Sequence, residues 1–207
     1  CLNWGCIPSK ALIHAANLVH EVEDFGPVKT EALRVDSTEL QAWKDGLIKK
    51  QRGGISTLLK ANKCDHMRGD AKITGANKLS VSGGDGETTE VTFQSLVIAT
   101  GASVIQIPGF EFDDKLVGYA KHGVSYDPVP TNLVIIGGGV IGSELGMVYA
   151  KLGSKVTIVE MLDQILPGTD KDLIRPVLKR MKKLGIEVLT KTKATGVDRQ
   201  SGGAKVM

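Results

Sequence analysis

The sequence is poor in three features that define whole classes of protein. It has three cysteines, too few for the disulfide framework of a small secreted domain. Its longest apolar runs, such as residues 133–140, have the length of a strand and fall far short of the roughly 20 residues of a membrane span. The formal net charge is only +3, without a stripe of Lys and Arg or stacking aromatics. We therefore expect neither a membrane nor a nucleic acid as a partner.

What remains is the composition of an ordinary globular protein, with 42% hydrophobic and 24% charged residues. A length of 207 residues is enough for one large domain or two small ones. Glycine is the informative residue type, because the 25 glycines cluster at residues 83–86, at Gly101 and at residues 137–142. Such clusters are typical of tight turns or of a backbone that closely approaches a ligand.

The first part of the chain predicts two helices. Apolar residues at three- and four-residue spacing predict a helix over residues 7–23, followed by a loop over residues 24–36. Ser37 is the expected N-cap of a second helix that ends near residue 62, and residues 53–54, Gly-Gly, suggest close packing there. The expected apolar face of this helix consists of Leu40, Trp43, Leu47, Ile55, Leu58 and Leu59.

From residue 64 the pattern changes to that of strands. "KLSVSGGDGETTEVTF" predicts a hairpin around a Gly-rich turn, and "SLVIAT" at residues 95–100 predicts a short buried strand. Residues 103–130 contain three prolines and are expected to be a connector that holds a domain boundary.

The remainder predicts strand, helix, strand, helix and strand. The segments are "NLVIIGGG", "VIGSELGMVYAKLG", "KVTIVE", residues 170–184 and "IEVLT". Such a series predicts a parallel sheet with right-handed crossovers. Gly153 is expected just past the end of the first helix. The side of that helix expected to be apolar carries Ile141, Leu145, Val148, Tyr149 and Leu152.

Residues 137–142 match G-x-G-x-x-G between a predicted strand and helix, with Glu160 at the end of the next strand. Gly137 would permit the turn, Gly139 would let a pyrophosphate approach the backbone, and Gly142 would let helix and strand pack closely. The helix N-terminus would offer its N–H groups to the phosphates. Glu160 would accept hydrogen bonds from ribose hydroxyls and repel a 2′-phosphate, which favours NAD over NADP. The alternative is a Gly-rich turn of another α/β protein.

Cys1 and Cys6 form a C-x₄-C pair that allows several interpretations. A structural zinc site usually needs four ligands, and only Cys64 and four scattered histidines could complete this pair, so we expect no metal. In a regular helix these Cα atoms would be roughly 8 Å apart, whereas a disulfide requires about 5.5 to 6 Å. A bond therefore requires Cys1 to precede the helix. The ring would be small, which favours a bond that opens over a structural staple.

The position of Cys6 also favours redox chemistry. It lies at the predicted helix N-terminus, where the partial positive charge favours a thiolate, and Lys10 lies one turn further on. Two ordinary half-buried thiols remain the alternative.

Taken together, these segments resemble one family. "CLNWGCIPSK" is similar to the redox-active segment of the pyridine nucleotide–disulfide oxidoreductases, "LVIATGA" resembles their second flavin motif, and residues 129–160 resemble their NAD motif. Ile7 and Ser9 are most similar to members that act on dihydrolipoamide. Disulfide reductases of the mercuric and glutathione types are the alternative. Trp4 departs from the usual Val.

The resemblance implies an α/β fold with a partial FAD-binding domain followed by a Rossmann-like NAD-binding domain with a parallel sheet. Residues 1–115 would be the C-terminal part of the FAD-binding domain with the redox-active disulfide helix, and residues 116–207 an incomplete NAD-binding domain. The family's FAD pyrophosphate loop, its later flavin-contacting Asp and its interface domain with a His–Glu base have no counterpart in the sequence. We therefore expect an internal fragment, inactive alone, of a protein that is a homodimer.

The resemblance also implies residue roles. Cys1 would exchange with the substrate, Cys6 would face the flavin, and Lys10 would pair with Glu144 as two buried charges near it. The expected FAD contacts are Lys10, Ala71, Thr100, Gly101 and Ala102. The expected NAD contacts are Gly137, Gly138, Gly139, Val140, Ile141, Gly142, Ser143, Glu144, Glu160 and Ala194.

The implied reaction is a relay in which dihydrolipoamide reduces the Cys1–Cys6 disulfide, and the electrons pass through FAD to NAD⁺. The dithiol would be carried by lipoyl domains of 2-oxo acid dehydrogenase or glycine cleavage complexes. The expected compartment is the bacterial cytoplasm or, in a eukaryote, the mitochondrial matrix.

Overall fold

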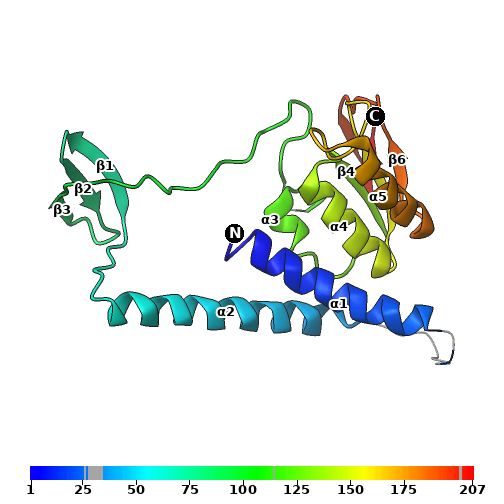
Figure 1. Ribbon diagram of the computed structural model, residues 1–207. Helices are drawn as coiled ribbons and strands as arrows, with labels where there is room; N and C mark the ends of the chain where they lie inside the picture. The colour runs from blue at the N-terminus through cyan, green and yellow to red at the C-terminus, as the bar shows by residue number, and fades with distance from the viewer. Residues whose placement is uncertain (26, 28–34, 114, 201) are drawn as a thin grey trace. The chain divides into compact units, whose positions relative to one another are not determined.

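The computed structural model describes residues 1–25, 27, 35–113, 115–200 and 202–207 (Figure 1). Most of the loop predicted at residues 24–36 lies outside them. The chain divides into two compact units, one of residues 1–51 and 105–207 and the other of residues 52–104. The division into an FAD part and an NAD part at residues 115 and 116 stays a prediction.

A parallel three-stranded sheet forms the centre of the first unit, as the sequence predicts. Its order is β4 (Asn132–Ile136), β5 (Lys155–Val159) and β6 (Glu187–Leu189), with both pairs parallel. The helices α4 (Val140–Lys151) and α5 (Lys171–Lys183) connect the strands. The chain is therefore a mixed α/β protein, while the handedness of the crossovers stays a prediction.

The core of this unit lies between the sheet and α4. The central strand β5 buries Val156 and Ile158 completely, and α4 buries Leu145, Val148 and Tyr149 against the sheet. The expectation for Ile141 is wrong, because this side chain, in the first turn of α4, is 60% exposed. Gly153 follows α4 with φ +99°, a conformation that ends the helix there as predicted.

Helix α1 (Cys6–Asp24) lies alongside α4, and Figure 1 shows the two helices side by side. It buries Leu12 and Ala16 in the same core. The short helix α3 (Ala120–Gly123), which the sequence did not predict, lies at the start of this pair. The Tyr149 hydroxyl of α4 donates a hydrogen bond of 2.8 Å to the Gly123 carbonyl oxygen, which fixes α3 to the core.

Helix α2 (Ser37–Ala61) begins in the first unit and ends in the second. Ser37 is not its cap: the Glu39 N–H donates to Asp36 Oδ1 at 3.0 Å. The Ser37 hydroxyl instead donates to Asp127 Oδ1 at 2.6 Å. The Asp36 carboxylate is the stronger acceptor one residue earlier, so it takes the capping role.

The expected apolar face of α2 is only partly covered. Leu40 is buried, whereas Trp43, Ile55 and Leu58 are exposed. The expectation of close packing at the two glycines is also wrong, because a Cβ at Gly53 or Gly54 would meet no atom within 4 Å. A helical period in the sequence therefore identifies a face that could be buried, but it does not show that another element covers that face.

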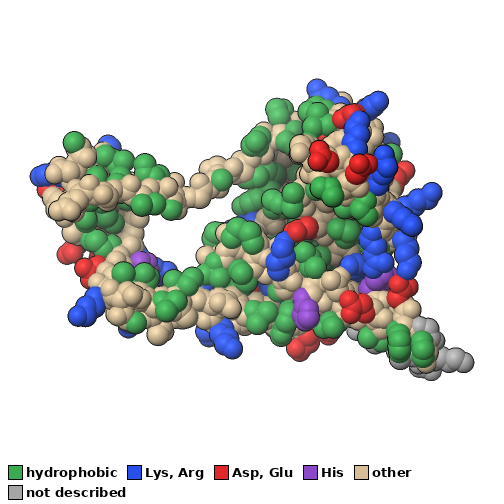
Figure 2. All heavy atoms as spheres, in the orientation of Figure 1, with side chains coloured by type: hydrophobic (Ala, Val, Ile, Leu, Met, Phe, Trp, Pro, Cys, Tyr) green, Lys and Arg blue, Asp and Glu red, His purple; other side chains and the backbone are tan. Residues whose placement is uncertain are grey.

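The second unit contains an antiparallel sheet of β1 (Asp70–Gly75), β2 (Lys78–Ser82) and β3 (Thr88–Thr92). The predicted hairpin is confirmed as β2 and β3, and β1 was not predicted. The buried strand expected at residues 95–100 is wrong: this segment has no regular structure, and Val97 is 85% exposed. A buried strand needs at least one pairing strand and cover over both faces, and no described strand pairs with this segment. Figure 2 shows the hydrophobic side chains on the surface of this unit.

The C-terminal hairpin of β7 (Val197–Gln200) and β8 (Gly203–Val206) was also not predicted. Arg199 Nε donates to Asp113 Oδ2 at 2.9 Å, which ties the hairpin to the connector. The Val117 N–H and then this guanidinium hold the pKa of Asp113 well below its usual range. Within the described part of the chain, no helix has the length and apolarity needed to cross a bilayer.

Replacing Tyr149 by Phe should lower the free energy of unfolding by about 1 to 3 kcal/mol, because the Gly123 carbonyl loses its donor in a buried setting. Urea unfolding near neutral pH measures the change. Tyr126→Phe is the matched control, since that ring packs against Tyr149 with 5.9 Å between centroids. An equal loss in both variants would show that the effect does not come from the hydrogen bond to Gly123.

The Tyr149 hydroxyl should also make the free energy of unfolding depend on pH. Burial raises the pKa of Tyr149 above its ordinary value, so the folded state holds the phenol neutral. The unfolded chain ionises it above about pH 10, so the stabilisation is complete below that pH and is lost as the pH rises further. Stability should therefore fall more steeply between about pH 9 and 11 in the parent chain than in Tyr149→Phe. Parallel slopes would contradict this expectation.

Candidate functional site

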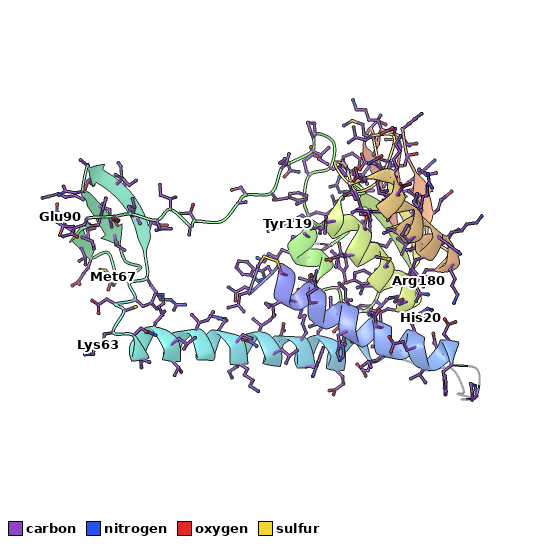
Figure 3. All side chains as sticks on the ribbon, viewed as in Figure 1. His20, Lys63, Met67, Glu90, Tyr119 and Arg180 are labelled. Carbon is purple, nitrogen blue, oxygen red and sulfur yellow. A yellow bond between two sulfur atoms is a disulfide. The ribbon has the colours of Figure 1, made fainter. Side chains whose placement is uncertain are left out.

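The first element of the site is a disulfide between Cys1 and Cys6, at the start of α1 (Figure 3). The Cα atoms are 4.6 Å apart, because Cys1 precedes the helix as the sequence analysis requires. The Cys1 carbonyl oxygen accepts hydrogen bonds from the N–H groups of Gly5 at 3.3 Å and Ile7 at 3.1 Å. A Cβ at Gly5 would lie 3.0 Å from the Cys1 Cα, so the tight return of the backbone favours glycine there.

Cys6 is the first residue of α1, a helix of 19 residues. The free N–H groups and the macrodipole at this end stabilise negative charge, so a Cys6 thiol released from the disulfide is biased toward thiolate. The remaining cysteine, Cys64, is free and exposed and belongs to the second unit. The disulfide can therefore open and close without competition inside its own unit.

The expected ion pair between Lys10 and Glu144 is present. Lys10 Nζ donates to Glu144 Oε1 at 2.6 Å and joins α1 to α4. The expectation that both charges are buried is wrong, since the Lys10 side chain is 57% exposed and that of Glu144 27%. Such a pair contributes at most about 1 kcal/mol to stability. The ion pair matters because it fixes the position of α1 relative to α4.

A second contact shows how the two helices are aligned. Lys151 Nζ, near the end of α4, donates to Asn17 Oδ1 on α1. Residues 10 and 144 differ by 134 in number, and so do residues 17 and 151. The helices therefore run parallel and in register, two turns apart at the two contacts. Because they are parallel, the N-terminus with the disulfide and the N-terminus with the glycine loop lie at the same end.

The glycine loop at residues 137–142 has the geometry of a phosphate cradle. Gly137 has φ +102°, and a Cβ on Gly142 would lie 2.1 Å from the Gly137 carbonyl oxygen, so both positions require glycine. A Cβ on Gly139, the N-cap of α4, would meet no atom within 4 Å. The loop is thus closed on the protein side and open at Gly139, which fits the pyrophosphate of a dinucleotide.

The Glu160 side chain accepts a hydrogen bond from the backbone of this loop and so fixes it, a role that was not predicted from the sequence. Its side chain is buried, and Oε2 accepts a hydrogen bond of 2.8 Å from the Gly138 N–H. Oε1 accepts one of 2.8 Å from the Leu162 N–H. Ser143 donates from its hydroxyl to the Gly138 carbonyl oxygen at 3.1 Å. The sequence did hold a signal for this role. Glu160 follows a strand, and the backbone N–H groups of a nearby glycine loop need an acceptor. A ribose contact of Glu160 stays a prediction.

The other expected NAD contacts surround the loop. Val140 and Ile141 lie exposed in the first turn of α4. Ala194 belongs to a segment held beside Glu160, because the Thr192 N–H donates to the Glu160 carbonyl oxygen at 3.0 Å. These placements leave the predicted contacts open to test.

The expected FAD contacts of the backbone lie in the second unit. Ala71 is in β1, and Thr100, Gly101 and Ala102 are in the exposed stretch that follows the hairpin. Gly101 has φ +81°, and no atom lies within 4 Å of the place of a Cβ, so the backbone is open to a ligand there. The flavin contacts of these four residues stay predictions. Among the described residues no His, Cys, Asp and Glu side chains gather into a metal-binding group.

A disulfide at a helix N-terminus, joined in register to a helix that carries a dinucleotide loop, defines a nucleotide-dependent disulfide oxidoreductase. The chain belongs to the pyridine nucleotide-disulphide oxidoreductase family, whose sequence profile matches residues 1–207. Members of this family use FAD and NAD(H).

Curated relatives match over the whole chain. The dihydrolipoyl dehydrogenase of Haloferax volcanii is 44% identical over 100% of this chain and 44% of its own length. That of Geobacillus stearothermophilus is 41% identical with the same coverage. A mitochondrial dihydrolipoyl dehydrogenase of Arabidopsis thaliana is 36% identical over 100% of this chain and 41% of its own length. The chain thus spans less than half the length of these relatives.

Solved structures share the fold. LpdA from Mycobacterium tuberculosis superposes with a TM-score of 0.91 at 23% identity, over 99% of this chain and 46% of its own. The HOCl-induced flavoprotein disulfide reductase RclA from Escherichia coli gives a TM-score of 0.81 at 24% identity, over 100% of this chain and 44% of its own.

Two glycine substitutions should separate folding from nucleotide binding. Gly142→Ala places a Cβ 2.1 Å from a backbone oxygen and should destabilise the chain by more than about 2 kcal/mol. Gly139→Ala meets no protein atom and should cost less than about 1 kcal/mol of stability. It should nevertheless weaken NADH binding about tenfold or more, because the methyl group occupies the open side of the cradle. Thermal unfolding and NADH fluorescence measure the two effects. Unchanged NADH affinity in Gly139→Ala would show that the pyrophosphate lies elsewhere.

Proposed function

We propose that the complete protein containing this chain is a flavin-dependent dehydrogenase that oxidises dihydrolipoamide and reduces NAD⁺. The observation that carries the proposal is the Cys1–Cys6 disulfide at the N-terminus of α1, aligned through Lys10 and Glu144 with the glycine loop of α4. The relatives named dihydrolipoyl dehydrogenase, which match the whole chain at 36 to 44% identity, support the choice of substrate.

The first step is an exchange between the substrate dithiol and the disulfide. One substrate thiolate attacks the Cys1 sulfur, so a mixed disulfide forms, the Cys1–Cys6 bond breaks, and Cys6 leaves as a thiolate. The second substrate thiolate attacks the substrate sulfur of the mixed disulfide, which closes the cyclic disulfide product and expels the Cys1 thiolate. The substrate loses two electrons, the cysteine pair gains them, and the two thiol protons pass to solvent or to a base.

The chain's own residues favour the start of this step. Cys6 is a good leaving group, because the end of α1 stabilises its negative charge. Lys10 adds a positive charge one turn away and is itself held by Glu144. When bound, FAD would accept the electron pair of the reduced cysteines and transfer it to NAD⁺.

The nucleotide is NAD rather than NADP. A buried carboxylate, Glu160, lies directly under the loop, and its negative charge opposes a 2′-phosphate on the adenosine ribose.

The partners proposed for the complete protein are the lipoyl domains of 2-oxo acid dehydrogenase or glycine cleavage complexes, together with a second copy of itself as a homodimer. The proposed compartment is the cytoplasm of a prokaryote or the mitochondrial matrix. Relatives from Geobacillus stearothermophilus and from Arabidopsis mitochondria support these two settings.

In the complete protein, Cys6→Ser should lower NAD⁺-dependent oxidation of dihydrolipoamide by about a thousandfold or more, because it removes the group that carries the electrons. Cys64→Ser is the matched control and should leave the rate unchanged, since that thiol is free and exposed. The assay follows NADH formation with NAD⁺ and, in parallel, with NADP⁺. A parent protein without lipoamide activity that instead reduces another disulfide or Hg²⁺ with NADPH would replace this proposal by the reductase alternative.

The exposed stretch around Val97 favours a second candidate for the chain by itself, namely a noncatalytic NAD-binding unit. The purified 207-residue chain should carry no bound flavin, because three of the residues expected to contact FAD, Thr100, Gly101 and Ala102, lie in an unpaired, exposed segment. Absorbance near 450 nm after gel filtration with added FAD tests this. A yellow chain that retains FAD would contradict it.

A further inference from the structure

One aromatic side chain in the redox segment has no role in the relay described above. Trp4 lies inside the ring that the Cys1–Cys6 disulfide closes, and it is 59% exposed. Only 4% of the residues of the chain are aromatic, and indole rings normally bury most of their surface in the core or in an interface. A largely exposed indole next to a reactive bond is therefore a candidate binding surface.

A residue outside the disulfide loop contacts the indole of Trp4. Lys121 Nζ lies 4.3 Å from the ring centroid of Trp4, a cation–π contact that covers one face of the indole. Lys121 belongs to α3, and the Tyr149 hydroxyl fixes that helix to the core through the Gly123 carbonyl oxygen. The position of the indole is thus set by the same core that aligns α1 with α4.

The surface beside the disulfide is apolar with basic edges. Ile7, in the first turn of α1, is also exposed, and it lies three residues from Trp4 on the other side of Cys6. Lys10 and Lys121 both belong to this end of the unit. An aliphatic chain attached to a dithiol would gain contact area on such a surface, whereas a short hydroxylated dithiol would gain none.

We propose that Trp4 is a substrate-binding residue whose uncovered face receives the hydrocarbon chain of the dithiol, and that Lys121 is a positioning residue that holds the indole for this contact. The inference rests on the proposed oxidation of dihydrolipoamide. Thiol exchange requires the attacking sulfur to line up with the disulfide, and the flexible chain of the substrate opposes that alignment. A rigid aromatic surface beside the bond orients the chain at little entropic cost.

The test compares two dithiols in the complete, FAD-loaded protein. Trp4→Ala should raise KM for dihydrolipoamide about five- to tenfold with kcat nearly unchanged, and should leave KM for dithiothreitol unaltered. Lys121→Met keeps the aliphatic stem and removes the charge, so it should raise KM for dihydrolipoamide about two- to threefold. Trp4→Phe should restore most of the affinity. Trp43→Ala, which removes an exposed tryptophan of α2, is the matched control and should change neither KM.

A second readout avoids the flavin. In flavin-free protein, the rate at which each dithiol reduces the Cys1–Cys6 disulfide is followed by alkylation of the released thiols. Trp4→Ala should slow the reaction with dihydrolipoamide and leave that with dithiothreitol unchanged. An equal change for both dithiols would assign Trp4 to the shape of the disulfide loop and overturn the inference. A parent protein that reacts with dithiothreitol but does not turn over dihydrolipoamide would overturn the proposed function itself.

Discussion

The parallel packing of α1 on α4 is the constraint on which the site depends. Leu12 and Ala16 of α1 and Val148 of α4 belong to one buried core, and this apolar contact keeps the helices together. The ion pair and the Lys151–Asn17 hydrogen bond, two turns apart, set the register. Because both helices start at the same end, two positive helix termini face the same region. One carries a disulfide, and the other carries the glycine loop.

The apolar core and the polar contacts between α1 and α4 contribute different amounts of free energy. An ion pair as exposed as Lys10–Glu144 stabilises the fold by at most about 1 kcal/mol, whereas burial of one Leu side chain contributes about 2 kcal/mol. The core therefore holds the helices, and the polar contacts select one of the alignments that the core would accept. The same reasoning applies to Lys121 and Trp4. Their cation–π contact is weak, but the hydrogen bond from Tyr149 to Gly123 holds α3, and with it Lys121, in a fixed position.

The glycine loop shows how a single carboxylate can serve structure before it serves a ligand. Glu160 receives N–H groups from Gly138 and Leu162 and so fixes the start of α4 relative to β5. A carboxylate oxygen can accept more than one hydrogen bond, so this role is compatible with a further contact to a ribose. The acid that the sequence analysis assigned to nucleotide choice is thereby also part of the scaffold.

Local pattern alone determined much of this protein. Period and glycine placement predicted α1, α4, the β2–β3 hairpin, the parallel sheet and the turn at Gly137, because each depends on neighbours within a few residues or on the βαβ connection. The spacing of Cys1 and Cys6 against helix geometry placed Cys1 before the helix. The resemblance, not spacing, suggested that Lys10 meets Glu144, since 134 residues separate them.

The tertiary structure decided the rest, for the physical reason that burial and pairing depend on what lies opposite. The apolar run at residues 95–100 has the composition of a core strand, yet without a neighbouring strand it stays exposed. The face of α2 that includes Trp43 has the right period and little to cover it. The same holds for Glu160 beneath the glycine loop and for Lys121 on Trp4: a sequence specifies which groups can interact, and only the folded chain brings particular groups into contact.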